Sequence, residues 1–163
     1  MATPTYQLQQ ARAADAALKK RRDEMQKTQA KWKAEYDGIR RELQSALPRT
    51  GARSHEELLT KPNVPQQTLN LLNRAAHLRV LISELDTLLV SAEKTLVDLD
   101  QQIWKLEKMV ELNAVTTPEE AAAIQRALAS ATELVRERQT AVTRADIAAE
   151  EAKLFRELVQ GAK

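Results

Sequence analysis

The feature that most constrains the fold is a run of twelve apolar residues between positions 71 and 110. Their spacing alternates between four and three residues without a break: Leu71, Ala75, Leu78, Ile82, Leu85, Leu89, Ala92, Leu96, Leu99, Ile103, Leu106 and Val110. A mean spacing of about 3.5 residues keeps the apolar stripe turned towards a partner only if helices wind around each other. The run therefore predicts a coiled-coil helix over about residues 64–113.

Further apolar residues widen this stripe on both sides. Leu81 and Leu88 lie on one flank, and Val90, Val97 and Trp104 lie on the other. A two-stranded coiled coil needs only a narrow seam, so the wider face predicts contacts with at least two neighbouring helices.

A helix start signal stands at residues 117–120. Thr117 is a suitable N-cap, Pro118 suits the first helical position, and Glu120 completes a capping box. Apolar residues then recur at helical spacing up to Gly161, where a helix end is expected: Ile124, Ala127, Leu128, Ala131, Leu134, Val135, Ala141, Val142, Ala145, Ala148, Ala149, Ala152 and Phe155. The pattern predicts one helix over about 118–160, with Glu150 and Glu151 on its solvated face.

The first helix, expected over about 5–47, has a weaker apolar pattern. Apolar residues recur every seven positions: Ala11, Leu18, Met25, Trp32, Ile39 and Ala46. The companion positions Asp15, Arg22 and Gln29 are polar, so we expect the first half of this helix to pack poorly, to fray, or to bind another molecule.

Residues 48–64 form an unusually long connector between the first two helices. Pro48 ends the first helix, and Ser54 with Glu57 forms a capping box, which predicts one short helical turn. We expect Leu58 and Leu59 to fold onto the end of the bundle, and His55 to have no catalytic role. The connector is predicted to be an ordered, exposed cap and a possible docking surface.

Three helices of similar length, two of them joined by a short link, favour antiparallel neighbours. The predicted fold class is all-α: an elongated antiparallel three-helix coiled-coil bundle, up-down-up, in a single domain over 1–163. The alternative is a hairpin of the last two helices, with the first helix donated to another subunit.

Composition argues against an enzyme. Aromatic residues make up 3 %, cysteine is absent, and the two histidines and three glycines are far apart in the sequence. Glycines so far apart cannot form a phosphate-binding loop, and the two histidines do not have the spacing of a zinc protease. Without cysteine there is no cysteine nucleophile. We expect no cofactor, no metal and no small-molecule substrate. No apolar run reaches the ~18–20 residues of a membrane span, and we expect an intracellular, cytoplasmic protein.

Two candidate binding regions emerge. A protein partner is predicted to bind Leu18, Met25, Leu58, Leu59, Val90, Val97 and Trp104; the alternative is that the third helix covers the Trp104 flank. A weaker nucleic-acid hypothesis concerns Lys19, Lys20, Arg21 and Arg22. These cations point around the whole helix and are followed by Asp23 and Glu24, so a solvated basic segment is favoured. Residues 1–47 hold ten Lys and Arg against six Asp and Glu, which contacts with the other two helices would also explain.

Together these features predict a non-catalytic scaffold or spacer subunit of a larger complex, filament-associated or of a virion or secretion type. Its partners would be other proteins or further copies of the chain. The alternatives are a helical chaperone or adaptor that holds a client protein, and a nucleic-acid-associated coiled coil that uses the basic first helix.

Overall fold

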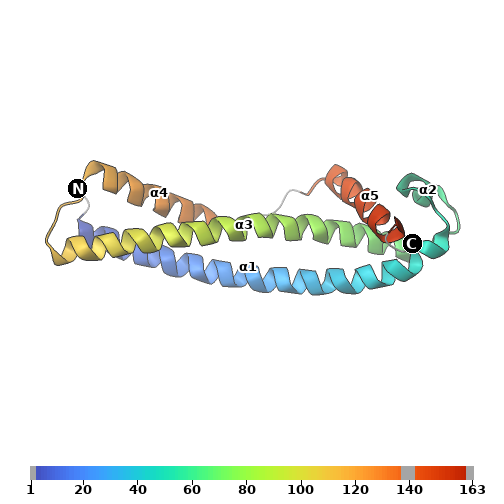
Figure 1. Cartoon of the computed structure of the whole chain (residues 1–163), viewed down its shortest axis with the longest axis horizontal. Coiled ribbons are helices and arrows are strands. Elements are labelled where there is room, and N and C mark those ends of the chain that lie inside the picture. Colours follow the sequence, from blue (N-terminus) through green and yellow to red (C-terminus); the bar gives the residue numbers. More distant parts are fainter. Residues whose placement is uncertain (1–2, 137–141, 161–163) are drawn as a thin grey trace. The chain divides into compact units, whose positions relative to one another are not determined.

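The computed structural model describes residues 3–136 and 142–160, and every regular element among them is a helix. In chain order these are α1 (Pro4–Ala46), a 3-10 helix η1 (Pro48–Thr50), α2 (His55–Thr60), α3 (Gln66–Glu111), α4 (Pro118–Val135) and α5 (Arg144–Gln160). The long helices α1 and α3 run antiparallel (Figure 1). The all-α prediction is confirmed for the described residues.

The chain divides into two compact units. Unit 1 comprises Met1–Lys27 and Asp86–Arg138, and unit 2 comprises Thr28–Leu85 and Gln139–Lys163. Each unit holds one stretch of α1 and one of α3. Unit 1 adds α4, whereas unit 2 adds the connector with α2 and the helix α5.

The predicted stripe of α3 lies inside both units. All twelve of its members are buried or half-buried. Ala75 and Leu78 in unit 2, and Leu99 and Leu106 in unit 1, have no exposed surface. Removing these side chains from water is the main stabilising contribution of the pairing with α1.

The first half of α1 packs better than its polar companion positions predict. Leu8, Ala11, Leu18 and Met25 are all buried in unit 1. Asp15 accepts an ion-pair contact from Lys19, at 2.8 Å, on its own helix. Arg22 pairs with Glu93 at 3.4 Å, and Gln29 Nε2 donates to Ile82 O at 3.3 Å. The polar positions are therefore accommodated by ion pairs and a hydrogen bond, and the apolar positions between them supply the core.

The single third helix predicted over 118–160 is wrong, because the structure has two helices there. α4 ends at Val135, and α5 starts at Arg144 with Thr143 before it. Asp146 N donates to Thr143 Oγ1 at 3.1 Å, and Thr143 N donates to Asp146 Oδ2 at 3.2 Å. This reciprocal pair satisfies backbone donors at a helix start. Residues 137–141 and Gly161 lie outside the described residues.

The inward face of α5 differs in part from the predicted one. Phe155 is 1 % exposed and Ala152 is half-buried, as the stripe predicts, but Ala145, Ala148 and Ala149 are exposed. Leu154 and Leu158, which the stripe did not include, are 0 % and 3 % exposed. Burying leucine removes more apolar surface from water than burying alanine, which favours the observed face.

The start of α5 can be tested with two threonine variants. We expect Thr143→Ala to lower the free energy of unfolding by about 1 kcal/mol, because an N-cap oxygen is lost. Thr132→Ala, inside α4 and exposed, should instead raise it slightly, since alanine has the higher helix propensity. Urea unfolding followed by circular dichroism measures both. Stabilisation by Thr143→Ala would mean that residue 143 lies within a helix.

The connector folds largely as its sequence predicts. Glu57 N donates to Ser54 Oγ at 3.1 Å, and Arg53 N donates to Glu57 Oε2 at 3.1 Å. The hydrogen bond from the Arg53 backbone lowers the pKa of the Glu57 carboxyl below its ordinary value, and the hydrogen bond and charge of Lys61 act in the same direction. Leu58 is fully buried in the core of unit 2, but Leu59 is 53 % exposed, so the prediction that both fold inwards is wrong for Leu59.

Candidate interaction surface

Three large apolar residues in unit 1 form a row on the surface of α3. Val90, Val97 and Trp104 are 70 %, 56 % and 61 % exposed. Because they are seven residues apart, they point in nearly the same direction along the helix. We call these three residues the outer row. Leu96 and Leu99, on the neighbouring inward face, are 4 % and 0 % exposed. Buried and exposed apolar side chains therefore lie within one turn of each other on α3.

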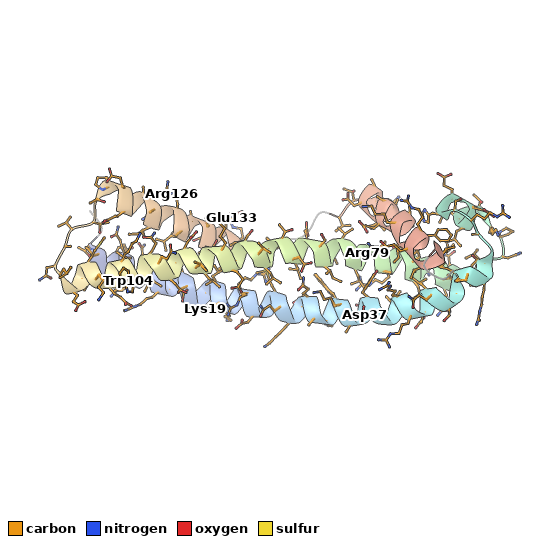
Figure 2. All side chains as sticks on the ribbon, in the orientation of Figure 1. Lys19, Asp37, Arg79, Trp104, Arg126 and Glu133 are labelled. Carbon is orange, nitrogen blue, oxygen red and sulfur yellow. The ribbon has the colours of Figure 1, made fainter. Side chains whose placement is uncertain are left out.

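The helix α4 leaves the outer row open because it packs against a different side of α3. It contributes Ile124 and Leu128 to a cluster that includes Leu106 and Met109. At about 100° per residue, Met109 points about 140° round α3 from Trp104. Figure 2 shows Trp104 on the side of α3 away from α4. Coverage of this flank by the third helix, the alternative raised above, is not observed for the described part of α4.

Charge pairs with α1 border one edge of the outer row. Arg12 Nη2 lies 3.0 Å from Glu107 Oε1, and Arg22 Nη1 lies 3.4 Å from Glu93 Oε1. Glu107 follows Trp104 by three positions, and Glu93 follows Val90 by three, so both acids lie on the same edge of the row. The charge difference between the first and second predicted helices is thus partly matched within unit 1. Pairs at this exposure contribute little stability each, but they fix which faces meet.

Three of the four consecutive cations at positions 19–22 form ion pairs within unit 1. Lys19 contacts Asp15 at 2.8 Å, and this hydrogen bond, with the charges of Asp15 and Asp100, raises the pKa of Lys19. Arg21 Nη1 lies 3.9 Å from Glu24 Oε2, and Arg22 contacts Asp23 and Glu93. Lys20 is exposed. These cations therefore form no continuous basic face of the kind that a phosphate backbone requires.

The residues predicted to bind a protein partner fall into two groups. Leu18, Met25 and Leu58 are 0 %, 2 % and 0 % exposed, so they belong to the cores and can meet another molecule only after local unfolding. The exposed group consists of the outer row in unit 1 and Leu59 in unit 2.

The link between α3 and α4 adds exposed apolar surface that the sequence analysis did not single out. Leu112 and Val115 are 76 % and 79 % exposed. Between them Asn113 has φ 52°, a left-handed conformation that asparagine tolerates at a helix end. The signal available in the sequence was two large apolar residues just beyond the last member of the α3 stripe.

Unit 2 contains a polar cluster that sequence reasoning missed. His55 Nε2 lies 3.0 Å from Glu151 Oε2, and Asn73 Nδ2 donates to Glu151 Oε1 at 2.7 Å. The side chains of His55 and Glu151 are each 12 % exposed. The cluster joins α2, α3 and α5, and the prediction that Glu151 is solvated is wrong. Residues so distant in sequence give no periodic signal.

Among the described residues, the hydrogen-bond partner of the His55 ring is the Glu151 carboxylate and not a hydroxyl. The neighbouring Ser54 hydroxyl accepts the backbone hydrogen bond that starts α2. A catalytic triad needs a hydroxyl or thiol nucleophile held by the histidine, with the carboxylate behind it. The geometry fits a structural role, in which hydrogen bonds of Glu151 with His55 and Asn73 hold α2, α3 and α5 together.

Comparisons with protein-family models, curated proteins and solved structures gave no match to this chain. Among the described residues, no helix is long and apolar enough to cross a membrane. In the same part of the chain, no three His, Asp or Glu side chains are grouped closely enough to hold a metal ion.

Proposed function

We propose that this chain is a non-catalytic assembly or scaffold subunit of a larger intracellular complex and acts through protein–protein contacts. The observation that carries the proposal is the outer row: two valines and a tryptophan, regularly spaced on one helix and more than half exposed. Single exposed apolar residues are normal on protein surfaces, but a row that faces one way is typical of an interaction site.

The helices around the row suit such a role. α1 and α3 contain 43 and 46 residues, and α3 carries a continuous seven-residue repeat on its inner side. We further propose that this seam winds as a coiled coil, which would hold the outer row straight and present it to a second helical protein. Tryptophan is enriched among the residues that contribute most to binding at protein interfaces.

Affinity capture of the tagged full chain from the cells that produce it tests the proposal. A scaffold subunit should retain one or a few proteins at fixed stoichiometry through washes in about 150 mM salt. A chaperone would instead retain many proteins at low occupancy, and a nucleic-acid-binding protein would lose its ligand after nuclease treatment. Either of these two results would contradict the assembly role.

A further inference from the structure

We propose, on the basis of the assembly function above, that the outer row binds an amphipathic helix of a different protein, one whose contact face carries acidic residues beside its apolar stripe. The inference concerns the chemistry of the partner, and it follows from the spacing of the row and from the charges on its two edges.

The spacing of the outer row matches a helix. Successive members are separated by two helical turns, or about 10.5 Å along α3. A partner helix that lies along α3 brings one apolar side chain to the same direction every seven residues, so its stripe can follow all three members. An extended strand would bring side chains to one face about every 6.6–6.8 Å and would lose this match.

The two edges of the outer row differ in charge. On the edge towards α1, Glu93 and Glu107 are already paired with Arg22 and Arg12. On the other edge lie Lys94 and Lys108, four residues after Val90 and Trp104.

The two lysines give their edge a positive charge that is compensated only in part. Lys94 is exposed and has no ion-pair partner among the described residues. Lys108 Nζ lies 5.9 Å from the centre of the Trp104 ring and 3.8 Å from Glu111 Oε2, with both side chains of that ion pair largely exposed. Carboxylates on an incoming helix would be attracted to this edge, whereas ammonium groups would be repelled.

A second copy of this chain fits the surface less well. In a twofold-symmetric pair the same patch meets itself. If the two α3 helices run antiparallel, the lysine edge of one copy meets the lysine edge of the other. If they run parallel, the lysines meet Glu93 and Glu107, which are engaged with α1. A different helix with free carboxylates avoids both difficulties.

The test uses two dye-labelled synthetic helices of about four heptads, with leucine at the two core positions of each heptad. One carries glutamate at both flanking positions and the other carries lysine, so like charges oppose self-association of either peptide. Fluorescence anisotropy with the full chain should show the glutamate peptide binding about tenfold more tightly than the lysine peptide. The double variant Lys94→Glu/Lys108→Glu should reverse this preference.

Two further variants identify the binding surface. Trp104→Ala should weaken binding of the glutamate peptide at least tenfold, because the largest apolar contact of the outer row is lost. Arg126→Glu makes the same kind of charge reversal on an exposed position of α4 and should change neither affinity. Circular dichroism confirms that each variant retains the helical content of the parent chain.

Equal affinity for the two peptides, or binding that survives Trp104→Ala unchanged, would overturn the inference. So would a concentration-dependent dimer of the chain that Trp104→Glu converts to monomer in sedimentation experiments, because a second copy would then cover the row. If affinity capture retains a stoichiometric protein that the Lys94→Glu/Lys108→Glu variant retains equally, the assembly function stands and this inference is wrong.

Discussion

Replacing Phe155 with alanine should lower the free energy of unfolding of unit 2 by about 3–5 kcal/mol. Phe155 is 1 % exposed and belongs to a cluster formed by α1, the connector, α2, α3 and α5. Its ring centre also lies 6.4 Å from that of His55. Truncation removes a large buried apolar surface and leaves a cavity that the surrounding helices fill only partly. Urea unfolding followed by circular dichroism measures the loss.

The matched control for Phe155 is Ala149→Gln in the same helix. Ala149 is exposed in the structure, so the change should alter the free energy of unfolding by no more than about 0.5 kcal/mol. The regular alanine pattern in the sequence would instead place this position in the seam. A loss of several kcal/mol from Ala149→Gln would show that position 149 is buried, as the alanine register predicts.

The second large effect is expected from Leu99→Ala in unit 1. Leu99 has no exposed surface and lies on the inner stripe of α3, so its truncation should cost about 2–5 kcal/mol. Val97→Ala, only two positions away, removes side-chain carbon atoms from a residue that is 56 % exposed. That variant should be neutral or slightly stabilising, since alanine has the higher helix propensity. Both values come from the same urea unfolding experiment.

The difference between the two variants reports directly on whether the outer row is open in the isolated chain. If Val97→Ala costs as much as Leu99→Ala, another part of the chain or a second copy covers Val97. In that case dilution separates the two explanations, because only a contact between copies weakens at low protein concentration.

The sequence alone predicted those helices whose position is marked by residues close together in the chain. The seven-residue repeat of α3 specifies both the helix and its inner face, because the same residues determine where the backbone is helical and which side avoids water. The capping residues Thr117 and Ser54 likewise mark the starts of α4 and α2, because each accepts a backbone hydrogen bond three residues away.

The division of the predicted third helix into α4 and α5 was missed because the apolar pattern continues past the start signal of α5. Thr143 and Asp146 form the same kind of cap as Thr117 and Glu120, but the alanine pattern around them continues at helical spacing. Alanine favours a helix without determining which face is buried. The repeat of small residues therefore predicted one continuous helix and an inward face from which the larger Leu154 and Leu158, both buried in the structure, were missing.

The candidate site could be predicted only in part. The flank of α3 that carries Val97 and Trp104 was recognised from its apolar spacing, but apolar residues occur on both flanks. Which flank is covered depends on tertiary packing such as the cluster that holds Ile124 and Leu106, residues that are far apart in sequence. The tie between His55 and Glu151 was missed because three separate helices must pack before it exists.

The most direct test of the proposed interaction surface is site-specific photo-cross-linking in cells that produce the full chain. A photoreactive amino acid replaces Val97 in one experiment and Arg126, exposed on α4, in a matched control. We predict that position 97 cross-links one major protein in high yield and that position 126 does not. Equal cross-linking at both positions, or none at position 97, would contradict the assignment of the outer row as a protein-binding surface.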